Sequence, residues 1–467
     1  MMKAAILGCG VIGAGWAARF LLMGWDVVVF DPQDGADQRL MRVIDAARRA
    51  LPMIYDTGLP DEGRLTFAQT LSEAVAGADW VQESVPERIE LKMKVYQTVQ
   101  AHCDPDAILA SSTSGFTPSA LQSCATRPAQ ILVAHPFNPV YLLPLVEVVA
   151  SPANPPEMVE RAEEVLAGVG MAPLHVRAEI DAHIADRLLE AVWRESLWLV
   201  KDGIATTAEI DDAIRLGFGL RWAQMGLFET YRIAGGEGGM AHFLAQFGPA
   251  LAWPWTKLMD VPDLDAELIA RIASQSDAQS GDRSIPELEQ LRDDNLVALL
   301  RALKARKAAA GHGLAEHEAT MREPLRDETP LCTARRVVPI DWTDQNGHMN
   351  ESRYGQVFSD AADAVLEHVG AGQSYIEQSF SYFTVETKTA FRAETHAGDR
   401  IEVLTRVATG DGKKLGLAHE MRRISDGTVL ATCDQLLVHV SLETRRSCPP
   451  RDIVARRIAA LAAAHET

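Results

Sequence analysis

A glycine pattern close to the start constrains this chain more than any other feature. It reads Gly8-Cys9-Gly10-Val11-Ile12-Gly13, follows a short β-type run and opens a helical stretch that is clear from Trp16 to Met23. In that setting the first glycine makes a tight turn, the second lets backbone approach a pyrophosphate, and the third lets helix and strand pack closely. The pattern predicts a βαβ unit that binds a dinucleotide through residues 8–13. A glycine-rich turn with a purely structural role is the alternative.

Asp31 comes directly after the second predicted strand, Trp25 to Phe30, and stands 18 residues after Gly13. A carboxylate at this place accepts hydrogen bonds from the adenosine ribose hydroxyls and repels a 2′-phosphate. The cofactor is therefore predicted to be NAD rather than NADP.

Further strand candidates alternate with helical stretches up to about residue 150. They are Trp80–Val81, Ile108–Ser111, Ile131–Ala134 and Leu145–Val149. This alternation is typical of an α/β Rossmann domain with a parallel sheet covered on both faces. From about Asp181 to Ala310 helical periodicity replaces the strand signal, which predicts an all-α second domain.

A third domain, of α+β type, is predicted towards the C-terminus. One amphipathic helix, about Ser352 to Val369, precedes four alternating strands: Phe380–Phe391, Arg400–Val407, Lys414–Ile424 and Val429–Leu442. A helix wrapped by an antiparallel sheet is the simplest arrangement. The segment from Gly311 to Pro330 is polar and contains Gly and Pro, which favours a linker. We therefore divide the chain into an NAD-binding domain 1–180, a helical substrate and dimerisation domain 181–318, a linker 319–332 and a last domain 333–467.

Composition narrows the classes of function. The net charge of −19 disfavours a nucleic-acid partner, because phosphate neutralisation needs clustered Lys and Arg. No apolar stretch reaches the roughly 18 residues of a membrane span. Glycines and Arg19 interrupt the apolar start of the chain, whereas a signal peptide has an uninterrupted apolar region.

The six cysteines form no C-x-x-C pair, so we expect no disulfide framework and no metal site. A reducing compartment, the cytoplasm, is therefore expected.

Two runs of residues suggest the chemistry. They are Ala134-His135-Pro136-Phe137-Asn138-Pro139 and Leu145-Val146-Glu147-Val148-Val149. With the glycine pattern they resemble the signature of the 3-hydroxyacyl-CoA dehydrogenase family, over roughly residues 3–310. The resemblance implies that His135 accepts the proton of a substrate hydroxyl and that Glu147 pairs with it, a role that suits a histidine near neutral pH. A histidine capped by its neighbours beside a proline-rich turn is the alternative.

The same resemblance implies further site residues. Ser114 is expected to meet the substrate and the nicotinamide, with Asn138 near the substrate hydroxyl; ordinary turn chemistry is the alternative for both. Glu83 and Glu87 match the family's loop after a strand and are expected on the cofactor side, unless they only begin a solvated helix.

The start of the second domain departs from the family pattern. Where the acyl-CoA enzymes have Gly-Phe-[apolar]-[apolar]-Asn-Arg, this chain has Ala182-His183-Ile184-Ala185-Asp186-Arg187. The carboxylate of Asp186 is useful beside a fixed cation. Aromatic rings of the helical domain can hold a quaternary ammonium group over their faces, or else serve as core or dimer interface. The candidate rings are Trp193, Trp222, Tyr231 and Trp253.

Two segments, Leu216–Trp222 and Trp253–Lys257, resemble the L-carnitine dehydrogenase branch of that family. Carnitine is a short 3-hydroxy acid with a trimethylammonium end, and Arg221 or Lys257 is the candidate partner of its carboxylate. The resemblance implies oxidation of L-carnitine to 3-dehydrocarnitine. A 3-hydroxyacyl-CoA or sugar-acid dehydrogenase is an alternative, and so is a non-catalytic, crystallin-like protein that binds NAD.

The last domain carries the run Asp344-Gln345-Asn346-Gly347-His348-Met349-Asn350, followed by Tyr354. It resembles the signature of hotdog-fold acyl-CoA thioesterases, over about residues 333–445. The resemblance implies that Asp344 acts as nucleophile or as base for water, aided by the N–H groups that begin the next helix. Helix capping by Asp344 is the alternative. The resemblance implies betainyl-CoA as the thioester substrate. A further alternative is that thioester hydrolysis is the principal activity of the chain. Both families dimerise, so a homodimer is expected.

Overall fold

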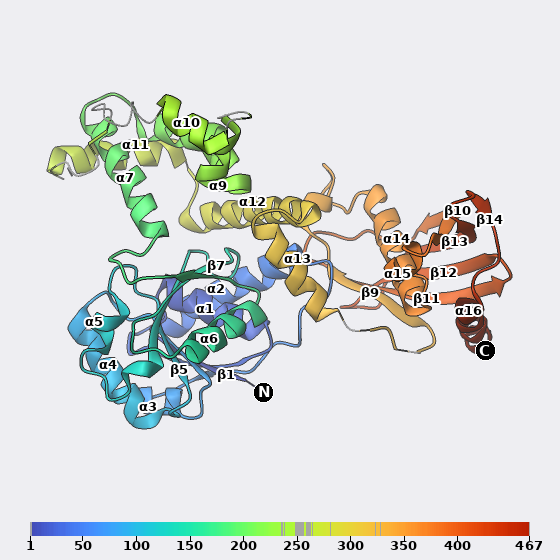
Figure 1. The fold of residues 1–467 in the computed structure, drawn as a ribbon, viewed down its shortest axis with the longest axis horizontal. Coiled ribbons are helices and arrows are strands. Elements are labelled where there is room, and N and C mark those ends of the chain that lie inside the picture. Colours follow the sequence, from blue (N-terminus) through green and yellow to red (C-terminus); the bar gives the residue numbers. More distant parts are fainter. Residues whose placement is uncertain are drawn as a thin grey trace. The chain divides into compact units, whose positions relative to one another are not determined.

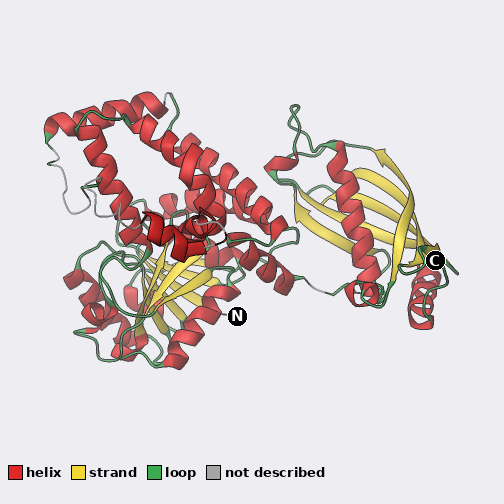
Figure 2. Ribbon diagram, turned by 45° about the horizontal axis from the view of Figure 1, so that its top comes forward, coloured by secondary structure: helices red, strands yellow, loops and turns green. Residues whose placement is uncertain are grey.

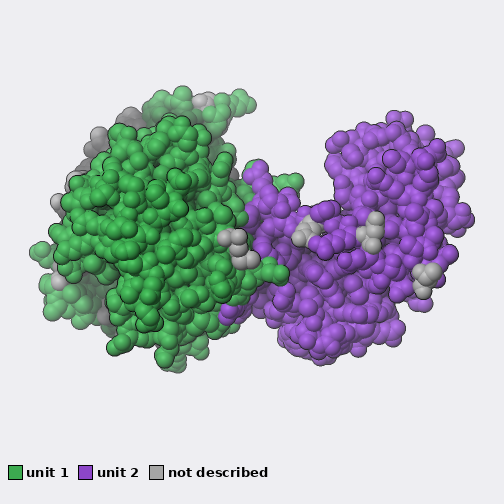
Figure 3. Space-filling model, turned by 90° about the horizontal axis from the view of Figure 1, so that it is seen from below, with its two compact units in different colours: residues 1–47, 61–315 green, residues 48–60, 316–467 purple. Residues whose placement is uncertain are grey.

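The computed structural model describes residues 2–234, 237, 239–247, 256–257, 263, 265–280, 282–322, 324–326 and 328–466. The chain forms two compact units, one of residues 1–47 and 61–315 and one of residues 48–60 and 316–467 (Figure 3). Among the described helices, none has the length and apolar character needed to cross a membrane.

The first unit contains an eight-stranded sheet with helices on both faces (Figure 2). The strands are β1 Lys3–Leu7, β2 Asp26–Phe30, β3 Leu65–Phe67, β4 Trp80–Glu83, β5 Ile108–Ser111, β6 Ile131–Pro136, β7 Leu145–Val149 and β8 Ala172–Val176. Their order across the sheet is β3-β2-β1-β4-β5-β6-β7-β8. The helices that accompany them are α1 Val11–Leu22, α2 Ala36–Ala50, α3 Leu71–Val75, α4 Ile89–His102, α5 Pro118–Gln122 and α6 Pro156–Gly168 (Figure 1).

The predicted βαβ opening is confirmed, since β1 and β2 pair in parallel on either side of α1. Helix α1 begins at Val11, directly at the glycine loop, earlier than the expected Trp16. Apolar runs such as residues 4–7 are fully buried, as central strands covered on both faces require.

The prediction of a wholly parallel sheet was wrong at one place, because β7 runs antiparallel to β6. Only residues 137–144 join these two strands, which is too short for the helical crossover that a parallel neighbour needs. The antiparallel register sets His135 directly opposite Glu147. Strands β3 and β8 were not predicted.

Helices make up the rest of this unit, which confirms the all-α second domain over its described residues. They are α7 Ala185–Lys201, α8 Thr207–Ala213, the π-helical turn η3 Ile214–Phe218, α9 Gly219–Ala234, α10 Gly239–Phe247, α11 Ala266–Ser280 and α12 Ile285–Arg306. The Tyr141 hydroxyl, after β6, donates to Oδ2 of Asp293 in α12 at 2.6 Å, so this helix is tied to the sheet domain.

The segment predicted as a linker from residue 311 is helical at its start. Helix α13 spans Ala310–Met321 and buries Leu314, His317 and Glu318 on one side. Burial of these side chains at helical spacing outweighs the low helix propensity of Gly311 and Gly313.

The second unit has a curved antiparallel sheet with a helix along its inner face (Figure 2). Its elements are β9 Leu331–Val337, α14 Glu351–His368, α15 Gln373–Ile376, β10 Phe380–Phe391, β11 Arg400–Asp411, β12 Lys414–Arg423, β13 Val429–Ser441, β14 Arg446–Ser447 and α16 Asp452–His465. The predicted helix and four strands are confirmed, and the unpredicted β9 adds a fifth strand to the order β10-β13-β12-β11-β9. Strand β9 begins at Leu331, two residues before the expected boundary, and α16 was not predicted.

Residues 48–60 also belong to the second unit, although they follow α2 in the sequence. The Tyr55 hydroxyl lies 3.1 Å from Nδ1 of His317, and the backbone N–H of Asp56 donates to Glu318 at 2.7 Å. No local sequence pattern marked this segment as part of the later unit.

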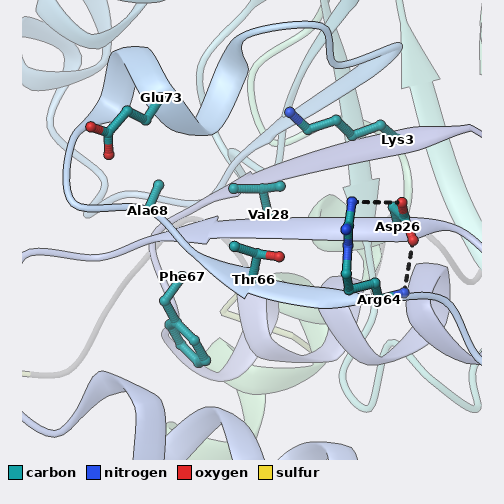
Figure 4. A pocket seen from close by; sticks show the side chains of 8 residues that line it. All are labelled: Lys3, Asp26, Val28, Arg64, Thr66, Phe67, Ala68 and Glu73. Carbon is teal, nitrogen blue, oxygen red and sulfur yellow. Dashed lines mark hydrogen bonds and ion pairs between the residues drawn. The ribbon is translucent and has the colours of Figure 1, made fainter.

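A hollow of about 430 Å³ lies at the amino ends of β1 and β2, between Lys3, Asp26 and Arg64 (Figure 4). Arg64 and Asp26 form an ion pair there at 3.4 Å. The glycine loop follows the carboxyl end of β1, so this hollow is not part of the site described next.

Candidate active sites

The glycine loop leaves room for a ligand at one position and is closed at two others. A Cβ on Gly8, which has φ +92°, would lie 2.7 Å from the Ser84 carbonyl oxygen, and a Cβ on Gly13 would lie 1.9 Å from the Gly8 oxygen. A Cβ on Gly10 would meet no atom within 4 Å. Gly10 is the N-cap of α1 and offers no side chain to its first N–H groups, which leaves them free for an anion.

Asp31 lies against this loop, as predicted for a residue next to the adenosine ribose. Its Oδ2 accepts from the Cys9 N–H at 2.6 Å and its Oδ1 from the Gln33 N–H at 2.8 Å. The loop backbone therefore fixes the carboxylate at the end of β2. Burial, with the Asp31 charge, raises the pKa of the Cys9 thiol to about 12, so this cysteine stays a neutral thiol.

His135 and Glu147 form the predicted pair. The Nδ1 of His135 lies 3.0 Å from Oε2 of Glu147, and both side chains are buried. The other carboxylate oxygen, Oε1, accepts from the N–H groups of Ile184 and Ala185 at 2.9 Å each. Burial by itself would raise the pKa of Glu147, but the hydrogen bonds from His135, Ala185 and Ile184 outweigh it and lower the pKa.

This geometry sets the tautomer of His135. An ionised carboxylate only accepts hydrogen bonds, so Nδ1 carries the proton and Nε2 presents a lone pair. The Oδ2 of Asp186, in the first turn of α7, lies 3.6 Å from that Nε2. Burial raises the pKa of Asp186, partly offset by the neighbouring His135. The imidazole thus lies between two carboxylates, with its proton-accepting nitrogen on the Asp186 side.

Ser114 and Asn138 lie at the same edge of the sheet as the glycine loop. Both are exposed, Ser114 after the carboxyl end of β5 and Asn138 after that of β6. Carboxyl ends of parallel strands meet at one edge, which is where ligands bind in such sheets.

The prediction for Glu83 was wrong, because this side chain is completely buried. Its Oε1 accepts from Lys92 Nζ at 2.8 Å, and its Oε2 accepts from Ser111 Oγ at 2.7 Å and Tyr96 OH at 3.0 Å. These donors leave no face for a cofactor, so Glu83 holds the ends of β4 and β5 together.

Glu87 is half exposed and lies beside the loop that carries Ser114. It accepts a hydrogen bond from the Thr113 hydroxyl and pairs with Lys92 at 3.2 Å. Burial tends to raise the pKa of Glu87, but the contacts with Thr113 and Lys92 outweigh it and lower the pKa.

The candidate substrate residues of the helical domain lie on two helices. Trp193 is on α7, while Arg221, Trp222 and Tyr231 are on α9. All four side chains are exposed, and Trp253 lies outside the described residues. The Trp222 ring lies 4.5 Å from that of Phe218, in the π-helical turn η3.

Lys257 was the second candidate for a substrate carboxylate. Its Nζ lies 2.6 Å from Oδ2 of Asp202 and 4.2 Å from the ring centre of Trp198. The lysine is therefore already paired, which favours Arg221 for that role.

His183 is a residue near the pair to which the sequence assigned no role. It is fully buried, and its ring centre lies 5.6 Å from that of His135. The signal was present in the sequence as a histidine where the family pattern has phenylalanine.

In the second unit, Asp344 forms a turn of its own. Its Oδ1 accepts from the Asn346 N–H at 2.8 Å, and Gly347 adopts φ +77°. The alternative that Asp344 caps the next helix was wrong, because Asn350 accepts the Ser352 N–H at 3.0 Å and caps α14. His348 pairs with Glu394 at 3.4 Å beside this turn.

Three family profiles match the chain. The NAD binding domain of 3-hydroxyacyl-CoA dehydrogenase matches residues 3–180 and the C-terminal domain of that enzyme matches residues 183–264. The thioesterase-like superfamily matches residues 338–458.

Relatives of known name agree with these profiles. A Ruegeria pomeroyi protein named L-carnitine dehydrogenase/betainyl-CoA thioesterase is 58% identical over 99% of this chain and 96% of its own length. A Mesorhizobium japonicum protein named L-carnitine dehydrogenase is 56% identical over 67% of this chain and 86% of its own length.

A solved structure is similar to the dehydrogenase part. It is an NAD+-dependent 5-formyl-3-hydroxy-2-methylpyridine 4-carboxylic acid 5-dehydrogenase, 27% identical, with a TM-score of 0.56 over 65% of this chain and 99% of that one. The open cradle at Gly10 and the carboxylate at Asp31 fit the NAD that this family uses. The chain is an NAD-dependent enzyme of the 3-hydroxyacyl-CoA dehydrogenase family, in the branch that carries a fused hotdog thioesterase domain.

Proposed function

We propose that this enzyme oxidises L-carnitine to 3-dehydrocarnitine with NAD and that its last domain hydrolyses an acyl-CoA thioester, betainyl-CoA. The His135–Glu147 pair, with Nε2 turned towards Asp186, carries the first part of the proposal. The names of the full-length relatives support both parts.

In the oxidation, His135 Nε2 takes the proton of the substrate C3 hydroxyl. The glycine loop and Asp31 would hold NAD, which would supply the acceptor for the hydride that leaves C3. Glu147 stabilises the imidazolium that forms, and the N–H groups of Ile184 and Ala185 keep that carboxylate ionised and in place. Ser114 and Asn138 orient the hydroxyl from the edge of the sheet, and Glu87 holds the loop on the cofactor side.

The position of Asp186 suits a cationic substrate. When the C3 hydroxyl of carnitine sits on His135 Nε2, its trimethylammonium nitrogen is two bonds from C3, within reach of a carboxylate that lies 3.6 Å from the same Nε2. The rings of Trp193, Trp222 and Tyr231 are the proposed contacts of the methyl groups. Arg221 holds the substrate carboxylate. A 3-hydroxy acid without a cationic end lacks the attraction to Asp186.

In the last domain Asp344 is the proposed nucleophile or base for water. Its Oδ1 is held by the Asn346 N–H, which fixes the carboxylate in the turn that precedes α14. The first N–H groups of α14 that Asn350 does not cap can polarise the thioester carbonyl.

NADH formation with L-carnitine, compared with 3-hydroxybutyrate, tests the oxidation. We expect a kcat/KM for L-carnitine at least about tenfold higher, as a close charge pair worth about 1.5 kcal/mol or more implies. Equal values for the two substrates would contradict the role of Asp186. Release of CoA from betainyl-CoA tests the second activity.

We further propose a cytoplasmic homodimer. Leu188 and Leu189 are exposed on α7, and Phe383 and Val385 are exposed on the edge strand β10, which supports burial of both elements by a second copy. Sedimentation analysis of the full chain tests the stoichiometry.

A further inference from the structure

The turn that leads into α7 has an unusual backbone. Ala182 and His183 both adopt positive φ angles, +59° and +50°, which cost non-glycine residues of the order of 1–2 kcal/mol each. Such a conformation persists only where the surroundings hold it. The contacts of this turn therefore indicate which groups it positions.

On one side the turn holds the loop that carries Ser114. His183 Nε2 lies 3.2 Å from the carbonyl oxygen of Thr113, and the Ala182 N–H donates to the carbonyl of Gly115 at 3.4 Å. These two carbonyls flank Ser114. Because a carbonyl only accepts, Nε2 of His183 carries the proton.

The surroundings of His183 favour the neutral ring. Burial lowers its pKa, and the carbonyl contact offsets this only in part. Its Nδ1 is thus a lone pair, buried and without a hydrogen-bond partner among the described residues. Burying a ring nitrogen without a hydrogen bond costs free energy. The hydrogen bond from Nε2 to the Thr113 carbonyl helps to offset that cost.

On the other side the same turn reaches the catalytic pair. The N–H groups that follow it, of Ile184 and Ala185, hold Glu147, while Asp186 faces His135. The turn thereby joins three groups that must act on one substrate. They are the Ser114 loop, the Glu147 carboxylate at Nδ1 of His135 and the Asp186 carboxylate at Nε2.

We propose that His183 is a positioning residue for the oxidation. Through its bond to Thr113 it sets the Ser114 loop against the His135–Glu147 pair. This rests on the proposed roles of His135 and Ser114. Phenylalanine, the residue of the related acyl-CoA enzymes at this position, fills a similar space but cannot make the bond.

Two variants of the full chain separate the hydrogen bond from the backbone. In His183→Gln the side-chain NH₂ occupies the place of Nε2 and can still donate to Thr113. In His183→Asn it occupies the place of Nδ1 and cannot, although asparagine tolerates a positive φ as well as histidine does. The steady-state kcat, the KM for L-carnitine, 3-hydroxybutyrate and NAD, and the thermal unfolding midpoint are measured for both variants and for the parent.

We expect kcat to fall about 10–100-fold in His183→Asn, because a small misplacement of substrate-orienting groups has this effect. The KM for NAD and the unfolding midpoint should stay near those of the parent, and His183→Gln should recover most of kcat.

A His183→Asn enzyme as fast as the parent would overturn the proposal, and so would a His183→Gln enzyme as slow as His183→Asn. The proposal would also be overturned if kcat fell in both variants in proportion to a fall in the thermal unfolding midpoint. Failure of the proposed cation site is distinguishable, since it would show in the parent as equal use of the two substrates.

Discussion

The Oδ2 of Asp186 lies 3.6 Å from Nε2 of His135, the nitrogen opposite the one that Glu147 holds. A carboxylate at this place has two consequences. It presents a negative charge beside the proton-accepting nitrogen of His135, and it is partly shielded from water, with 18% of its side chain exposed. Both strengthen its interaction with a bound cation.

Replacing Asp186 with asparagine should remove the preference for a cationic substrate. Loss of a partly buried charge pair is expected to lower kcat/KM for L-carnitine about 10–100-fold, while the value for 3-hydroxybutyrate stays the same or rises. Steady-state NADH formation measures both. Glu164→Gln, exposed on α6, is the control and should change neither.

Replacing Glu147 with glutamine should impair proton removal. The amide can no longer stabilise the imidazolium or set the tautomer of His135, so kcat should fall about 10²–10⁴-fold. Glu164→Gln, exposed on α6, is the control. A Glu147→Gln enzyme with parental kcat would contradict the assignment of His135 as base.

The lowered pKa of Glu147 also predicts an acid-labile fold. A carboxyl whose folded pKa lies below its ordinary value of 4.5 stabilises the fold above that pH, and the contribution disappears as the pH falls through the folded pKa. Unfolding midpoints between pH 7 and pH 3.5 should decrease more steeply for the parent than for Glu147→Gln. Parallel curves would show that this carboxylate contributes no such stability.

Ala182→Gly should stabilise the protein, because glycine adopts φ +59° without steric cost. The gain is expected to be about 0.5–1 kcal/mol, which raises the unfolding midpoint by a few degrees. Ala182→Val, with a β-branched side chain at the same place, should lower it. A midpoint that falls in the glycine variant would mean that the alanine methyl group packs more favourably than the backbone argument allows.

The two activities should be separable by single substitutions in the full chain. Asp344→Asn should reduce CoA release from betainyl-CoA by at least about a hundredfold and leave L-carnitine oxidation unchanged. His135→Ala should do the reverse. Each variant is the control for the other, and loss of both activities in either one would indicate a folding defect instead.

The second unit should lose stability in weak acid through His419. This side chain lies under α14, with Nδ1 2.8 Å from Thr405 and Nε2 3.2 Å from Gln435. Burial lowers its pKa from 6.5 to about 4, so the unfolded chain binds the proton first and stability falls as the pH drops from 6.5 towards 4. Hydrogen exchange of β11 and β12 peptides measures this, and His419→Gln should flatten the pH dependence, whereas His368→Gln should not.

Much of the fold was readable in the sequence because the signals are local. The glycine spacing, the apolar run of β5, the aromatic and β-branched residues of β10 and the periodicity of α14 each depend on neighbouring residues, whose backbone preferences do not need the rest of the chain. The pairing of His135 with Glu147 was instead implied by the family resemblance, and the antiparallel register of β6 and β7, which was not predicted, sets the two residues opposite each other.

What depends on distant residues was visible only in three dimensions. The burial of Glu83 follows from Lys92, Tyr96 and Ser111 converging on it, and the segment 48–60 joins a unit that begins more than 250 residues later. The approach of Asp186 to His135 and the bond from His183 to Thr113 likewise require the start of α7 to return to the sheet edge. Residue type shows what a side chain can do, but its partners are selected by the packing of all elements together, and no local pattern encodes that packing.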